Sequence, residues 1–146
     1  KYQSGVFNAS IFYFNEAIDL AKKSGQSNIA ISNYYYNLAS AYDKLEDFNN
    51  SILNFENCLQ LDEKNIGAYD KLMKIYFNLK RYEDALKVNI RVLTLYPKND
   101  KIILAGQQIA EALYGKKTDY YLNLILEKGL INKNSFGKLK DEILFK

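Results

Sequence analysis

Apolar side chains recur every three or four residues along most of the chain, the spacing that places them on one face of a helix. Alternating β-branched residues are scarce and the chain has a single proline, Pro97, so the pattern predicts an all-α protein. Gly25 and Pro97 are expected to end two helices, and Asn99 to cap the start of another. Seven or eight helices are expected, at about residues 6–24, 28–44, 48–61, 65–78, 82–95, 100–114 and 118–129, with the eighth following Asn134 or Ser135.

Residues 66–99 repeat the pattern of residue types found in residues 32–65. Tyr35 corresponds to Tyr69 and Tyr42 to Tyr76, and each matched pair is 34 residues apart. The other matched pairs are Leu38 and Leu72, Phe48 and Tyr82, Ile52 and Leu86, Leu59 and Leu93, and Leu61 and Leu95. Each unit reads as a helix, a tight turn and a second helix, and such a pair cannot bury its apolar face alone. A period of this length predicts a stack of like units that share one core.

The repeated unit resembles the tetratricopeptide repeat, whose pattern is W-x2-L-G-x2-Y, then A-x3-F, then P. The two units here carry Tyr35-x2-Leu38-Ala39-x2-Tyr42 with Ser51-x3-Phe55, and Tyr69-x2-Leu72-Met73-x2-Tyr76 with Ala85-x3-Asn89 and Pro97. Small residues such as Ala39 and Ser51 let the two helices of a pair approach each other. Met73 and Asn89 depart from the pattern, so we expect a wider pair at Met73 and thinner packing at Asn89. The resemblance implies a right-handed α-solenoid of antiparallel helix pairs.

This resemblance divides the chain into one solenoid domain with several parts. Residues 28–65 and 66–99 are complete repeats, residues 100–129 a degenerate repeat with smaller residues such as Gly106, and residues 130–146 a capping helix. The first helix matches the second helix of a repeat at an offset of 41 residues, since Phe14 corresponds to Phe55. Residues 1–27 therefore form part of an incomplete repeat, and we expect its first helix to lie before Lys1 in a longer protein.

Composition narrows the classes of function. The 146 residues include 20 basic and 17 acidic side chains, and a net charge of +3 gives no case for nucleic-acid binding. With no histidine and one cysteine, Cys58, neither a Ser–His or Cys–His catalytic pair nor a Cys/His metal site can form within this chain. We expect Cys58 to be a buried apolar residue, and the protein to be cytoplasmic, without membrane insertion, cofactor or enzymatic activity.

The resemblance implies a binding surface, because the first helix of each tetratricopeptide repeat lines a concave groove for a peptide or partner helix. By position, the expected groove residues are Asn33, Tyr36, Asn37, Ser40, Lys44, Asp70, Lys71, Lys74, Phe77, Lys101, Leu104 and Gln108. Lys71, Lys74 and Lys101, with the side-chain amide of Asn37, could hold a carboxylate or acidic segment. Tyr36 and Phe77 lie off the expected core face and suit interface anchors. Of the run Tyr34 to Tyr36, at least one ring is expected outside the core.

These features favour a protein–protein interaction scaffold or adaptor. One alternative within the family is a co-chaperone-like reader of acidic C-terminal tails, which uses a clamp of five residues. Asn37 matches its middle position, Lys71 stands where arginine is expected, and Gly67 stands where the second lysine is expected. A further alternative is the substrate-selecting region of a larger enzyme. The identity of the partner, the orientation of a bound peptide and the oligomeric state are left open.

Overall fold

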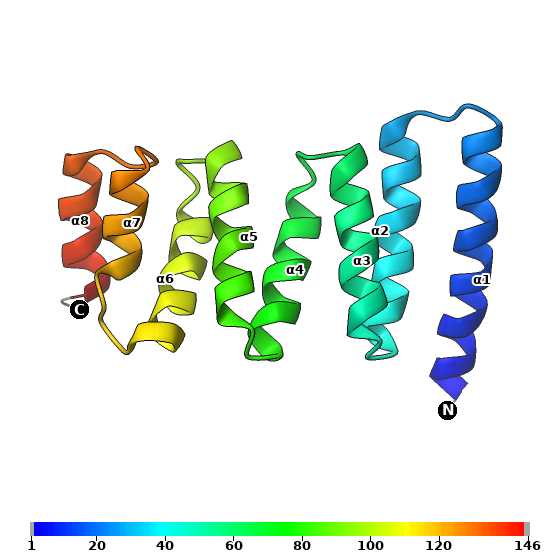
Figure 1. The fold of residues 1–146 in the computed structure, drawn as a ribbon, viewed down its shortest axis with the longest axis horizontal. Coiled ribbons are helices and arrows are strands. Elements are labelled where there is room, and N and C mark those ends of the chain that lie inside the picture. The colour runs from blue at the N-terminus through cyan, green and yellow to red at the C-terminus, as the bar shows by residue number, and fades with distance from the viewer. Residues whose placement is uncertain (1, 145–146) are drawn as a thin grey trace. The chain divides into compact units, whose positions relative to one another are not determined.

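The computed structural model describes residues 2–144, and for Tyr2 and Gln3 it describes the backbone alone. Within that range the chain forms eight α-helices and no strand, which confirms the expected all-α fold (Figure 1). The helices are α1 (Tyr2–Lys23), α2 (Asn28–Lys44), α3 (Phe48–Leu61), α4 (Ile66–Asn78), α5 (Tyr82–Leu95), α6 (Asp100–Tyr114), α7 (Tyr120–Glu127) and α8 (Lys133–Leu144).

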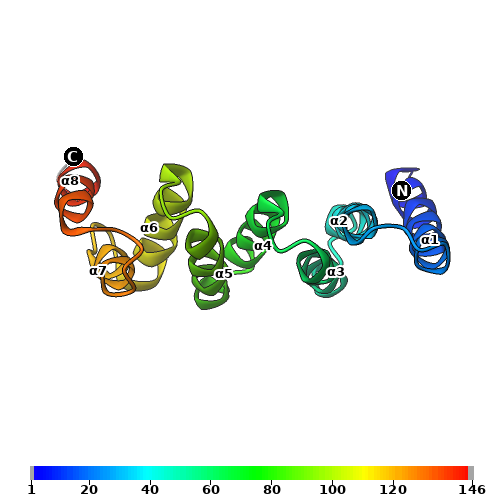
Figure 2. The same cartoon turned by 90° about the horizontal axis from the view of Figure 1, so that it is seen from above.

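The chain divides into two compact units, residues 1–75 and residues 76–146, with the boundary inside α4. In unit 1, α1, α2 and α3 pack in succession, and in unit 2 the same holds for α5 to α8 (Figures 1 and 2). Consecutive helices within a unit run in opposite directions, as expected of a tetratricopeptide-like solenoid.

Four helix ends, in three helices, differ from the sequence prediction. The first helix begins at Tyr2 and not near residue 6. The seventh begins at Tyr120 and ends at Glu127, so it is shorter than the expected 118–129. The eighth begins at Lys133, because Asn132 caps it: the Asn132 side-chain oxygen accepts a hydrogen bond of 2.8 Å from the Ser135 amide. The other ends agree with the prediction to within one residue.

The turns inside successive repeats have the same backbone geometry. Glu46 and Lys80 occupy equivalent positions and both are left-handed, with φ of 59° and 60°. The amide of the next residue reaches back into the helix in each case, from Asp47 to the Tyr42 carbonyl and from Arg81 to the Tyr76 carbonyl. This hydrogen bond closes the helix end over a left-handed residue. The 34-residue period is therefore a repeat of backbone conformation as well as of side-chain type.

Small residues bring α2 and α3 together in unit 1. Ser51 is fully buried, and its hydroxyl donates a hydrogen bond of 2.8 Å to the Ala39 carbonyl across the two helices. Tyr35 and Tyr42 were expected in the core but are only half-buried, because they flank a smaller buried cluster that includes Ile18 and Leu38. All three rings from Tyr34 to Tyr36 are likewise half-buried, so none of them is a fully buried core residue.

The core of unit 2 is built around a tyrosine that comes late in the chain. Tyr121 on α7 is fully buried, and its hydroxyl donates a hydrogen bond of 2.6 Å to the side-chain oxygen of Asn89 on α5. The Asn89 amide in turn donates a bond of 2.8 Å to the Ile102 carbonyl on α6. The expectation of thinner packing at Asn89 was wrong, because this fully buried side chain connects three helices.

Gly106 makes room for that tyrosine. A methyl group built at Gly106 would lie 2.0 Å from the Tyr121 ring carbon that bears the hydroxyl. Gly106 lies 34 residues after Leu72 and so corresponds to it in the repeat. The space beside Gly106 on α6, the volume that a leucine would occupy, is thus filled by the Tyr121 ring of α7.

Candidate functional site

The exposed side chains that the sequence assigned to a groove form a stripe along α2. Asn33, Asn37 and Lys44 are exposed, and their spacing of four and seven residues places them on one helix face. Ser40 lies in the same stripe but is half-buried, and its hydroxyl donates a hydrogen bond of 2.9 Å to the Tyr36 carbonyl of its own helix. The amides of Asn33 and Asn37 are the groups of this stripe that suit an extended peptide backbone.

A second stripe lies on α4 and has less positive charge than its lysines suggest. The Lys74 ammonium and the Asp70 carboxylate form an ion pair of 2.9 Å on the exposed surface. The hydrogen bond that Lys74 donates to the Asp70 carboxylate raises the pKa of Lys74, so the lysine keeps its charge. An exposed pair of this kind contributes about 0–1 kcal/mol to stability. Its main effect is that Lys74 is already occupied by a carboxylate, while Lys71 lies half-buried beside it on the helix.

Tyr36 lies between the two stripes. Its ring is half-buried and meets Phe55 of α3 edge-on, with ring centroids 5.4 Å apart. Burial raises the pKa of Tyr36, and the negative charge of Asp70 adds to this effect. Tyr36 is therefore in part a packing residue, and the structure brings it together with Asp70 and Lys74 on one side of unit 1.

Gly67 is the position at which a clamp for acidic tails would need a lysine. A methyl group built there would lie 3.3 Å from the Asn65 side-chain oxygen and 3.4 Å from the Tyr36 ring. The contact with Asn65 is slightly tighter than usual and the one with Tyr36 is an ordinary close contact, so little free space lies directly beside Gly67.

The remaining expected groove residues lie in unit 2. Phe77 is 37% exposed and meets the Tyr82 ring edge-on at 5.1 Å between centroids. Lys101, Leu104 and Gln108 are all exposed, and their spacing of three and four residues places them along one face of α6. Leu104 also borders a concavity.

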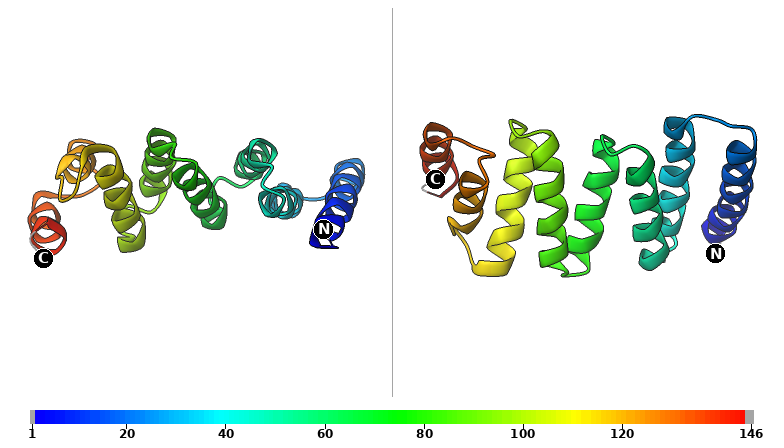
Figure 3. Two further views of the ribbon diagram at one scale, coloured as in Figure 1. Left: turned by 90° about the horizontal axis from the view of Figure 1, so that it is seen from below. Right: turned by 45° about the horizontal axis from the view of Figure 1, so that its top comes forward.

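That concavity is a hollow of about 660 Å³ between α6 and α8, which we call the α6/α8 hollow. Figure 3 shows the ribbons of the two helices, α6 in yellow and α8 in red. Its apolar part comes from Ile103 and Leu104 of α6 and from Leu139 and Ile143 of α8, among others. The remaining lining residues are Pro97, Lys98, Asp100, Gly129, Leu130, Ile131, Asn132, Ser135, Lys138 and Glu142. Sequence reasoning missed the contribution of α8, because its apolar face was interpreted as a cap for the stack.

Two kinds of group bear on catalytic chemistry in the described residues: metal-ligating side chains and the thiol of Cys58. Residues 2–144 contain no group of three or more metal-ligating side chains close enough to hold an ion. Cys58 is fully buried, as expected, and burial raises the pKa of its thiol to about 11. A protonated, enclosed thiol is a poor nucleophile. None of the described helices is both long and apolar enough to span a bilayer.

Paired antiparallel helices with a recurring turn define a helical repeat protein. The family model described as tetratricopeptide repeat matches residues 32–65, which is the first of the two units recognised from the 34-residue period. This segment is a tetratricopeptide repeat, and the match confirms the family resemblance there. No curated protein matches the chain.

Proposed function

We propose that the chain is a scaffold or adaptor that holds a peptide or partner helix against the first helices of its repeats. Tetratricopeptide repeats generally mediate protein–protein interactions, and residues 32–65 are such a repeat. The observation that carries the proposal is the α6/α8 hollow, whose volume of about 660 Å³ falls within the range of roughly 300–1,000 Å³ typical of ligand sites.

The lining of the α6/α8 hollow favours an apolar ligand side chain with polar groups on either side. Leu104 is 49% exposed at its edge, although a leucine normally gains by burial. The charged residues around it are two lysines and two carboxylates (Lys98, Lys138, Asp100 and Glu142), so their charges cancel. Binding here would draw its affinity from buried apolar area and not from net charge.

In unit 1 the proposal rests on the α2 stripe. The Asn37 side chain is exposed and can both donate to and accept from a peptide backbone. Lys71 of α4 adds one positive charge, at the position where the clamp for acidic tails has an arginine. The reader of acidic tails is less well supported, because Gly67 is packed under Tyr36 and Lys74 is paired with Asp70.

We also propose that α1 is the second helix of an incomplete repeat. Tyr13 and Leu20 are 68% and 66% exposed on α1. The residue of α3 that corresponds to Tyr13 is Asn54, which is buried. A first helix packed on α1 would cover the same face, and this supports the proposed organisation. The boundaries of the other repeats remain predictions.

The test uses a displayed library of random 12-residue peptides, from which binders are selected with the whole chain as the target. The affinity of a selected peptide is then measured by calorimetric titration. We expect the Asn37→Ala, Lys71→Ala double variant or the Leu104→Ser variant to weaken a selected peptide at least tenfold, with an unchanged melting temperature. The matched control is Asn15→Ala with Lys23→Ala, which removes the same two exposed side-chain types from α1.

Two outcomes would argue against the proposal. Failure to select any peptide above background would remove the case for a binding face. A fall in melting temperature of the Asn37→Ala, Lys71→Ala variant would make both residues structural. An acidic peptide with a free C-terminus, compared with its amidated form, tests the alternative: only a requirement for the free carboxylate would favour a reader of acidic tails.

A further inference from the structure

Unit 2 has a second concave surface, formed by α5 and α7 with the end of α6. Figure 2 shows α5 and α7 on the side of the unit away from α6 and α8. A groove of about 510 Å³ lies there, which we call the α5/α7 groove. Its lining residues are Glu83, Leu86, Lys87, Ile90, Arg91, Leu113, Tyr114, Leu124 and Lys128. It shares none of these residues with the α6/α8 hollow.

The floor of the α5/α7 groove is apolar. Leu86 and Ile90 are four residues apart on α5 and so lie on one helix face, and Leu124 lies on α7. Ile90 and Leu124 are only half-buried, as is Leu113 at the end of α6. An apolar strip between two helices, with its side chains still partly in water, is a typical seat for the apolar face of another helix.

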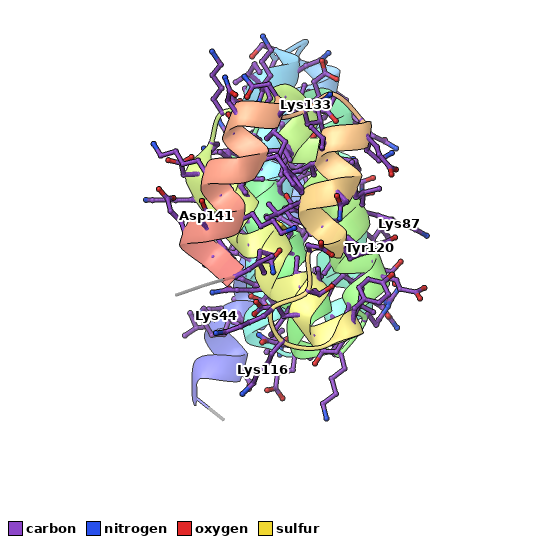
Figure 4. All side chains as sticks on the ribbon, turned by 90° about the vertical axis from the view of Figure 1, so that its left-hand side faces the viewer. Lys44, Lys87, Lys116, Tyr120, Lys133 and Asp141 are labelled. Carbon is purple, nitrogen blue, oxygen red and sulfur yellow. The ribbon has the colours of Figure 1, made fainter. Side chains whose placement is uncertain are left out.

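The edges of the groove are predominantly basic. Lys87 and Arg91 lie four residues apart on α5, beside the apolar strip, and Lys128 follows the last turn of α7. Glu83 is the one acidic residue of the lining. Three positive charges against one negative give this groove a charge of +2 out of the +3 of the whole chain. Figure 4 shows that Lys87 of α5 and Tyr120 of α7 come out on the same side of the unit.

Two tyrosines mark one end of the groove. Tyr114 is 51% exposed and lines the groove, and its ring lies 4.2 Å from that of Tyr120 between centroids. A hydrogen bond with Tyr120 raises the pKa of Tyr114, so its hydroxyl stays protonated. Exposed paired tyrosines offer a large contact area at a low cost in side-chain entropy, and residues of this type often anchor interfaces.

We propose that the α5/α7 groove docks an acidic amphipathic helix of a partner protein. The apolar strip fits the apolar face of such a helix, and the basic edges fit carboxylates on either side of it. A second copy of this chain fits poorly, because no described helix has a net charge beyond −1: α3, α6 and α7 each have −1, and the others have 0 or +1. The α5/α7 groove is separate from the α6/α8 hollow of the proposed function, so a partner at one site leaves the other site open.

The test uses a fluorescein-labelled 18-residue peptide with leucine on one helix face and glutamate elsewhere, and its counterpart with lysine in place of every glutamate. We expect saturable binding of the glutamate peptide to the whole chain, measured by fluorescence anisotropy. Lys87→Glu with Lys128→Glu is expected to weaken it at least tenfold and to improve binding of the lysine peptide. Lys133→Glu, at an exposed lysine at the start of α8, is the matched control and is expected to change binding less than twofold (Figure 4).

Other results would overturn the proposal. These are the absence of saturable binding, equal binding of the two peptides to the unaltered chain, or an equal effect of Lys133→Glu and of the double charge reversal. Weakening by Leu104→Ser but not by the double charge reversal would place the peptide in the α6/α8 hollow. That result would support the proposed function while refuting the α5/α7 site, so the two ideas fail separately.

Discussion

Replacing Gly106 by alanine tests the account of the unit 2 core most directly. Alanine is a better helix residue than glycine by about 1 kcal/mol, so propensity alone predicts stabilisation. The structure predicts the opposite, because the new methyl would lie 2.0–2.3 Å from three atoms of the Tyr121 side chain. Forcing such a contact apart in a packed core costs typically about 1–3 kcal/mol. The overlap here is severe, so we expect a net loss of about 2 kcal/mol.

Tyr121→Leu supplies the matching background. Leucine lacks the ring atoms and hydroxyl that the methyl would meet, although the variant itself is less stable because it leaves space in the core. In this background Gly106→Ala should stabilise the protein by about 1 kcal/mol, the propensity gain alone. The effect of one substitution thus changes sign with the other. The coupling between the two positions is about 3 kcal/mol, which is near the upper end for residues in contact.

Equilibrium unfolding in urea, followed by circular dichroism of the helices, measures these differences. Gly137→Ala is the control, since that glycine lies in α8 with no atom within 4 Å of the added methyl, and it should gain about 0.5–1 kcal/mol. The melting temperature should fall by about 4–8 °C for Gly106→Ala. The reasoning is refuted if Gly106→Ala is as stable as the unaltered chain, or if it has the same effect in both backgrounds.

Three further predictions concern other buried groups. Asn89→Ala should lower the free energy of unfolding by about 2–3 kcal/mol in the same urea assay, because the Ile102 carbonyl and the Tyr121 hydroxyl each lose a buried partner; a neutral result would contradict the three-helix connection. Tyr42→Ala should cost less than Tyr69→Ala, for which about 3–5 kcal/mol is expected, because Tyr69 is buried and Tyr42 is half-buried; the reverse order in urea would overturn the assigned register. Folding raises the pKa of Cys58 from 9.0 to about 11, so its stabilising contribution is complete below about pH 9 and is lost as the pH rises through about 11. The stability difference between the unaltered chain and Cys58→Ala should therefore narrow between pH 8 and 11, and a difference independent of pH would refute this.

The sequence predicted the helices well, and also the tetratricopeptide resemblance of residues 32–65, because both depend on short-range spacing. Helix periodicity and a 34-residue period can be read directly from residue types, and turn geometry follows from them. The charge of the α4 stripe was less well predicted. Lys74 was treated as available to a carboxylate ligand, although Asp70 lies four residues before it, the spacing at which opposite charges pair on a helix. That signal was present in the sequence.

Other features could not be predicted from spacing. The hydrogen bond between Tyr121 and Asn89 joins residues 32 apart in the sequence, and neither residue type indicates the other. Asn89 on its own is a polar residue at an aromatic position, and Gly106 on its own is a weak helix residue. The structural role of both residues becomes clear only once the position of the Tyr121 ring is known. The contribution of Leu139 to the α6/α8 hollow has the same origin, because the face of a terminal helix is assigned only once its neighbours are placed.

The exchange of volume between Gly106 and Tyr121 has a consequence for how such chains diverge. A position that lacks a large residue on one helix can be filled by a side chain of a later helix, and each of the two residues is then constrained by the size of the other. The segment from α6 to α7 can therefore depart from the repeat pattern at Gly106 while the space beside this glycine stays filled. Because the two side chains share one space, a larger residue at position 106 should be tolerated best when residue 121 becomes smaller.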